Sequence, residues 1–238
     1  RPYLDSDSRG ISVCSDRQME TAIDFCKKNH CQLSMHAMGT KAIERVVDRA
    51  AQEEKWNLGP EPYIRVEHIT LPSEDSIEKA AAHGIGFVTQ PIFLYAEIES
   101  YLKNLGTEKM KTCYPIRHLL EKGVKLCLST DAPATSWAVP SDPFPNIKGA
   151  VTRKAWDGTD CGEDQAIDIE PALILYTKES AEIAGFKGLG QLKEGYKADF
   201  LILDRDLLEI SPKEIDQISV AETYIGGRCV YRKAASVE

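Results

Sequence analysis

Residues 63–90, YIRVEHITLPSEDSIEKAAAHGIGFVTQ, carry the pattern that decides the fold of this chain. Residues 63–68 alternate apolar and polar side chains, as a half-buried strand does. Residues 72–83 begin with acidic side chains and end just before Gly84, which are the start and stop signals of a helix. Residues 86–90 are again rich in strand-forming residues. Two strands joined by one helix predict a parallel pair, because parallel neighbours need a crossover connection.

The same strand-helix unit recurs on both sides of this stretch. Upstream, a short β-rich run at 32–36 lies between helices that the apolar spacing predicts over 16–28 and 41–54. Downstream, a helix over 115–122 leads into the most apolar strand of the set, 124–130. Single strands that alternate with helices predict an α/β fold on a parallel sheet, either an open doubly wound sheet or a (β/α) barrel. No GxGxxG motif follows a strand, which disfavours the dinucleotide-binding form of the open sheet.

The last part of the chain changes in character after Asp131. Residues 132–166 are rich in Pro, Asp, Gly and Thr and predict a long loop with one helix near residues 146–155. A single helix is predicted over 170–184, with a proline in its first turn. The tail predicts a small β-sheet with strands at 198–203, 222–225 and 228–231, the last two joined by Gly226 and Gly227.

Composition and charge exclude several classes of protein. The 238 residues are 42% hydrophobic and 28% charged, which is typical of a globular protein. There are 37 acidic and 29 basic residues, so the net charge is -8 and disfavours nucleic acid and anionic membrane surfaces as partners. No apolar run approaches the roughly 20 residues that a membrane span needs. We expect neither a nucleic-acid partner nor a membrane partner.

The number and spacing of the seven cysteines indicate the redox environment of the protein. Their number is odd and no CxxC pair occurs, whereas a secreted disulfide framework has an even, closely spaced set. The pattern predicts a reducing, cytoplasmic environment. No signal peptide opens the sequence, but the chain begins at Arg1 rather than Met, which leaves the question of an upstream targeting segment open.

Three chemically capable residues stand at equivalent places, because His36, His68 and Asp131 each end a predicted strand. In α/β sheets and barrels this edge is where sites assemble. Two neutral imidazoles and a carboxylate suit a divalent metal, zinc first. The competing interpretation is that the histidines are solvated strand ends and the aspartate forms a turn. Spacing alone leaves both interpretations open.

Five segments together resemble one known family, the metal-dependent amidohydrolase superfamily. The similarity is strongest to its amidohydrolase-3 branch, which includes N-substituted formamide deformylases. The matching segments are HAMG at 36–39, EH at 67–68, STDAP at 129–133, PFPNIKGAVTR at 143–153 and GQLKEGYKAD at 190–199.

The resemblance implies a (β/α)8 barrel with a β-sandwich built from both chain ends. In that family an HxH pair follows strand 1, a carboxylated Lys or a Glu follows strand 4, and His36, His68 and Asp131 match the residues after strands 5, 6 and 8. No HxH occurs in this chain, and Thr40 stands where the family usually has Asp. A full barrel needs about 250 residues. We therefore expect barrel strands 5–8 within residues 1–188 and a β-sandwich segment over residues 189–238.

The resemblance also implies a function. In the intact protein we expect a zinc-dependent hydrolase of amide-like C–N bonds in N-acyl or N-formyl amines, with His36, His68 and Asp131 at the metal. Asp131 would transfer the proton, and Gln90 and Arg153 would reach the small-molecule amide substrate. The isolated chain is expected to be inactive without the missing N-terminal half of the barrel. The alternative is a non-catalytic half-barrel module that forms a homodimer or pairs with a separate N-terminal half through its unpaired edge strands.

Overall fold

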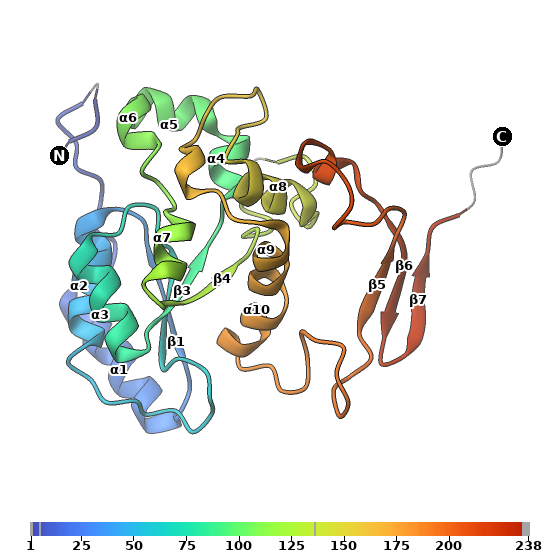
Figure 1. Ribbon diagram of the computed structural model, residues 1–238. Helices are drawn as coiled ribbons and strands as arrows, with labels where there is room; N and C mark the ends of the chain where they lie inside the picture. The colour runs from blue at the N-terminus through green and yellow to red at the C-terminus, as the bar shows by residue number, and fades with distance from the viewer. Residues whose placement is uncertain (1, 5, 136, 235–238) are drawn as a thin grey trace.

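The computed structural model describes residues 2–4, 6–135 and 137–234 and confirms an α/β fold with a parallel sheet (Figure 1). Four strands lie side by side in chain order, and every neighbouring pair is parallel. They are β1 (Leu33–Ala37), β2 (Ile64–His68), β3 (Gly86–Thr89) and β4 (Lys125–Leu128). Each overlaps the stretch that its sequence pattern predicts.

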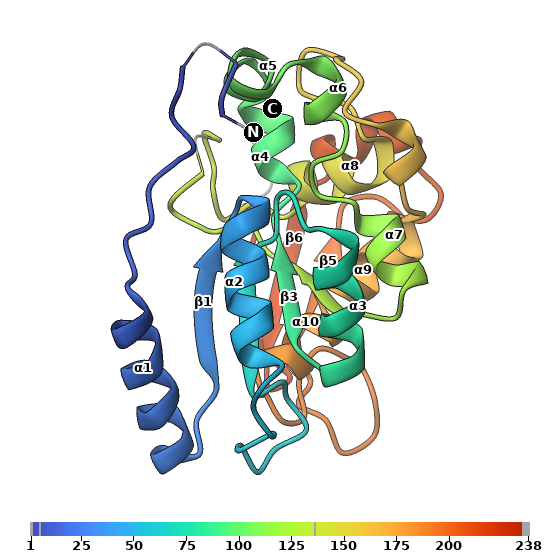
Figure 2. The same cartoon turned by 90° about the vertical axis from the view of Figure 1, so that its left-hand side faces the viewer.

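Helices cover one face of this sheet and the edge of β4. They are α1 (Asp16–Asn29), α2 (Thr40–Ala50), α3 (Glu74–His83), α4 (Ile92–Ala96), α5 (Ile98–Leu105), α6 (Thr107–Met110), α7 (Ile116–Glu121), α8 (Phe144–Thr152), α9 (Ile169–Tyr176) and α10 (Lys178–Ile183), with 3-10 turns η1 (Glu163–Gln165) and η2 (Pro212–Gln217). Figure 2 shows α2 and α3 in front of the sheet, whereas α9 and α10 contact β4 at its edge. None of the described helices is long and apolar enough to span a membrane.

The two faces of the sheet differ in polarity. Toward the helices, Ile64, Val66 and Phe87 are buried in the main hydrophobic core, together with the apolar stripe of α2. The opposite face of β1 and β2 carries polar side chains, and we call it the polar face: Ser34, His36, Arg65 and Glu67. Parallel strands covered by helices on both sides are usually apolar throughout. The alternation therefore marks a face that helices do not cover.

The segment after the sheet departs from the prediction in one respect. The single helix predicted over 170–184 is wrong, because α9 and α10 are separated by a break at Thr177. The Thr177 hydroxyl donates to the carbonyl of Leu173 at 2.6 Å, and the Ser180 hydroxyl lies 2.8 Å from the carbonyl of Leu175. Such hydroxyl contacts with the preceding turn compete with the helical hydrogen bonds and bend the helix.

The long loop contains the helix predicted near residues 146–155, now located as α8. It ends where Arg153 adopts a left-handed conformation with φ of 51°. The three helices α4, α5 and α6 between β3 and α7 had no counterpart in the prediction, because that stretch has no clear periodic pattern.

The tail forms a three-stranded antiparallel sheet of β5 (Phe200–Leu203), β6 (Val220–Ile225) and β7 (Arg228–Arg232). The predicted hairpin is confirmed. Gly226 and Gly227 have φ of 58° and 76°, the paired positive values that a tight hairpin turn requires. Figure 1 shows this sheet beyond α9 and α10, on the side away from α1. The division at residue 188 and the β-sandwich remain predictions.

Candidate active site

The carboxyl ends of β1, β2 and β4 bring His36, His68 and Asp131 together. The His36 and His68 ring centroids are 4.3 Å apart with the rings inclined at 65°. The Nε2 atom of His68 lies 3.9 Å from Oδ2 of Asp131. The three residues therefore meet at one sheet edge, as their strand-end positions predict. Their roles as metal ligands remain predictions.

The backbone is strained at this edge. His68, Ile69 and Asp131 have φ of 76°, 51° and 55°, a left-handed region that residues other than glycine rarely adopt and that β-branched residues such as Ile avoid. Neighbouring strands hold the conformation, because the Ile69 amide donates to the Ala37 carbonyl at 3.2 Å and the Thr89 hydroxyl donates to the His68 carbonyl at 3.0 Å. Strain of this kind gathers at functional sites.

His68 has the electrostatic properties of a neutral imidazole. It is only 7% exposed. Burial lowers its pKa first, the neighbouring His36 lowers it further, and the carboxylates of Asp131 and Glu67 act in the opposite direction. Its buried Nδ1 atom has no hydrogen-bond partner. A neutral ring with a free buried nitrogen is the form of histidine that binds metal ions.

The three donors are of the types that bind a divalent metal, but they are too few to complete its coordination. Two imidazoles and a carboxylate are the ligand types that zinc takes in catalytic sites. Within the described ranges, however, no three His, Cys, Asp or Glu side chains stand close enough to hold an ion. The three residues therefore fit as part of a metal site that needs further donors.

Gln90 reaches the same edge from the end of β3. Its side chain is buried, its Nε2 donates to the Ser129 hydroxyl at 2.9 Å, and its buried Oε1 has no partner. Gln90 thus lies between the strands that carry His68 and Asp131. The predicted contact with substrate remains a prediction.

The structure does not bring Arg153 into this group. Its guanidinium is 1% exposed and donates only to backbone carbonyls among the contacts described. The acceptors are the carbonyls of Cys113, Tyr114, Cys161 and Gly162, at 2.6 to 3.2 Å. These contacts tie the loop after α8 to the segment before α7, so the predicted substrate-binding role has no support in the contacts of Arg153.

Two further residues at the edge were not predicted. The Phe93 ring packs on His68 with centroids 5.7 Å apart. Asn146, fully buried on α8, accepts from the Ile92 amide at 2.8 Å and donates to the Ser129 carbonyl at 3.0 Å. It thereby links the segments that follow β3 and β4. No local signal marked Asn146, because the same helical stretch also contains the polar residues Lys148 and Thr152.

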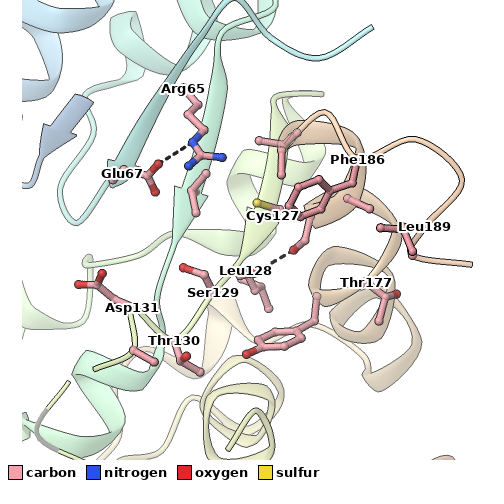
Figure 3. A pocket seen from close by; sticks show the side chains of 18 residues that line it. Arg65, Glu67, Cys127, Leu128, Ser129, Thr130, Asp131, Thr177, Phe186 and Leu189 are labelled. Atoms are coloured by element: carbon pink, nitrogen blue, oxygen red, sulfur yellow. Dashed lines mark hydrogen bonds and ion pairs between the residues drawn. The ribbon is translucent and has the colours of Figure 1, made fainter. Parts of the chain in front are cut away.

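A groove of about 540 Å³ leads from Asp131 along the sheet (Figure 3). Strand residues line one wall, including Arg65 and Glu67, which are paired at 2.8 Å. Thr177, Phe186 and Leu189 face them from the other wall. At the edge of β4 the Ser180 hydroxyl donates to the Leu128 carbonyl at 3.0 Å. Asp131 is therefore reachable from a solvent-filled space.

Comparison with known proteins points to one family. The model described as "Amidohydrolase family" matches residues 1–231. The putative amidohydrolase YtcJ of Bacillus subtilis is 30% identical over 98% of this chain and 44% of its own length. The N-substituted formamide deformylase of Arthrobacter pascens is 28% identical over 95% of this chain and 41% of its own.

A solved structure agrees with these relatives. The crystal structure of an uncharacterized metal-dependent hydrolase from Pyrococcus horikoshii superposes with a TM-score of 0.76 and 27% identity, over 90% of this chain and 42% of that one. The chain thus spans less than half the length of each of these three proteins.

Proposed function

The chain belongs to the amidohydrolase family, in its amidohydrolase-3 branch, and from this membership we propose that the intact protein is a metal-dependent hydrolase of amide C–N bonds. The proposed substrates are N-acyl or N-formyl amines. The formamide deformylase among the relatives supports this class. The observation that carries the proposal is the meeting of His36, His68 and Asp131 at the carboxyl edge of the sheet.

In this proposal His36 and His68 hold a divalent metal, most simply zinc, with Asp131 beside it. Such a metal lowers the pKa of a coordinated water and polarises the substrate carbonyl when it is bound. The lowered pKa of His68 keeps its ring neutral, with a lone pair available. Phe93 packs against the ring and restricts its orientation.

Asp131 is the proposed proton carrier. Its carboxylate stands 3.9 Å from His68, which is longer than a hydrogen bond, so that contact does not fix it. Asp131 takes a proton from the attacking water as the water oxygen bonds to the carbonyl carbon. It then delivers that proton to the nitrogen as the C–N bond breaks, which yields a carboxylic acid and a free amine.

The remaining ligands must come from outside these strands. Within the described residues β1 and β4 each have a neighbour on one side only, and the groove lies beside β4. We propose that a segment bearing an HxH pair completes the barrel there. The alternative function is that of a non-catalytic half-barrel module. It pairs through the same strand edges, either with a second copy of the chain or with a separate N-terminal half of the barrel. In solution this alternative predicts a stable homodimer, or a stable complex with the separate half, without bound metal.

Metal content tests the site directly. The intact protein should purify with zinc or another transition metal, and His68→Ala should lower that content sharply, as measured by elemental mass spectrometry. His83→Ala is the matched control, because His83 is exposed at the end of α3. Full metal retention in a double His36→Ala, His68→Ala variant would end the assignment.

A further inference from the structure

The end of α1 holds two cysteines in one capping motif. His30 is left-handed, with φ of 52° and ψ of 36°. The Cys31 amide donates to the Cys26 carbonyl at 3.1 Å, and the His30 amide donates to the Lys27 carbonyl at 3.3 Å. These two bonds around a left-handed residue define a Schellman motif, which a contact between the side chains of its first and last residues frequently accompanies. Here those residues are Cys26 and Cys31.

The burial of the two cysteines agrees with the backbone motif. Cys26 is 6% exposed, and its sulfur lies 4.0 Å from the carbonyl oxygen of Gln32, the residue after Cys31. Cys31 packs against the same core but is only half-buried. Burial and the adjacent Cys31 thiol raise the pKa of Cys26 to about 11. One thiol of the pair is therefore shielded and protonated, and the other is accessible.

We propose that Cys26 and Cys31 are a redox-active dithiol, which closes to an intrachain disulfide on meeting a small disulfide oxidant such as oxidised glutathione. The Cys31 thiolate attacks the oxidant, forms a mixed disulfide and releases one thiolate. Cys26 then gives up its proton and attacks the Cys31 sulfur, which releases the second thiolate. One external disulfide is thus reduced to two thiols as the protein loses two hydrogen atoms.

The other cysteines lack this arrangement. Cys113, Cys127 and Cys161 are buried, and burial raises the pKa of each. Cys14 and Cys229 are half-buried and belong to other parts of the chain. A competing interpretation treats Cys26 and Cys31 as two small hydrophobic residues. The two interpretations differ in whether Cys26 and Cys31 form a disulfide with each other when a disulfide oxidant is added.

The location gives the disulfide a structural effect. It would join the end of α1 to the residues that lead into β1, the strand that carries His36. The Trp56 indole donates to the Cys31 carbonyl at 2.8 Å, so its fluorescence provides a nearby reporter. This inference does not depend on the proposed hydrolase activity, because thiol chemistry is measured without substrate.

The test uses the protein with Cys14→Ser and Cys229→Ser, which removes the two other accessible thiols. Native protein is treated with dithiobis(nitrobenzoate). We expect two thionitrobenzoate ions released per chain, no reagent left on the protein, and a mass lower by two hydrogen atoms. Peptide mapping should place the bond between Cys26 and Cys31, and dithiothreitol should restore the original mass.

Two further variants isolate each thiol. With Cys26→Ala in the same background, Cys31 should keep one thionitrobenzoate group as a stable mixed disulfide. With Cys31→Ala, the shielded Cys26 should react at least tenfold more slowly than Cys31. Circular dichroism checks that each variant is folded. An adduct retained on Cys31 while Cys26 is present, or no reaction at either thiol in the folded protein, overturns the proposal.

Discussion

Position 131 has two requirements. The proposed chemistry needs a carboxylate there, and the local structure needs a residue that tolerates a left-handed backbone. Asn tolerates that backbone about as well as Asp, whereas most residues do not. Asp131→Asn therefore removes the proton acceptor and keeps the local shape. We expect kcat of the intact enzyme to fall by about 10²–10⁴-fold, with metal content and unfolding midpoint nearly unchanged.

Steady-state kinetics on an N-formyl amine measure this effect. The control is Asp157→Asn, because the exposed Asp157 carboxylate accepts a hydrogen bond from the Thr159 amide in a turn. Turnover close to wild type in the Asp131→Asn variant would assign Asp131 to turn formation instead.

Arg153, unlike Asp131, is a charged residue with a structural role. Arg153→Met keeps the length of the side chain but leaves the carbonyl oxygens of Cys113 and Cys161 without a donor. The other two carbonyls, of Tyr114 and Gly162, also accept from backbone amides. Unsatisfied buried polar groups cost about 1–3 kcal/mol each, so we expect a loss of about 3 kcal/mol or more in the free energy of unfolding. Urea denaturation measures it, with exposed Arg17→Met as the control. Equal stability of the two variants would contradict the structural role.

The sequence located the candidate site residues by position rather than by type. His36, His68 and Asp131 were recognisable because each ends a strand, and strand ends of a parallel sheet share one edge. The burial of Arg153 was not recognisable, because two of its acceptors, the carbonyls of Cys113 and Tyr114, lie 40 and 39 residues earlier in the chain. The contact of Phe93 with His68 also depends on how α4 folds back, which no local pattern records.

At the scale of elements, α8 positions the strand ends through Asn146. Asn146→Ala removes both the acceptor for the Ile92 amide and the donor to the Ser129 carbonyl. We expect a loss of about 2 kcal/mol in the free energy of unfolding. Asn146→Asp should recover none of it, because its carboxylate would be a buried, unpaired charge facing the Ser129 carbonyl. The intact Asn146→Ala enzyme should lose kcat with little change in KM, since Ser129 precedes Asp131 by two residues.

Thermal and urea unfolding, together with kinetics, measure the two effects of Asn146. The control is Asn104→Ala, because the Asn104 amide donates to Ser100 within its own helix. A stability loss no larger than that of the control would remove Asn146 from this role.

The strands were predictable because alternation and glycine stops are local signals. The break between α9 and α10 was not, because it depends on hydroxyl contacts of Thr177 and Ser180, one of which reaches β4. Both Ser and Thr also occur in unbroken helices. The helices α4, α5 and α6 are short, and short helices carry too few turns to show a period.

At the scale of the whole molecule, the metal site is incomplete in the described residues. We expect the 238-residue chain alone to hydrolyse no formamide or N-acyl amine, with or without added zinc. Addition of a polypeptide that supplies the HxH pair and the missing strands should restore turnover. Liberated amine is the measurement, and a His68→Ala chain in the same mixture is the control. Robust turnover by the chain alone would refute the half-barrel proposal.

The chain-order arrangement of β1, β2, β3 and β4 has a consequence for how the protein is made. Each strand pairs with the one that left the ribosome just before it, so the sheet can grow during synthesis without waiting for a distant segment. The closing contacts span modest stretches of chain, which favours rapid folding. Until the next strand arrives, however, the newest strand presents a bare edge to solvent or to a chaperone. Slow translation between β3 and β4, where α4 to α7 intervene, would prolong that exposure.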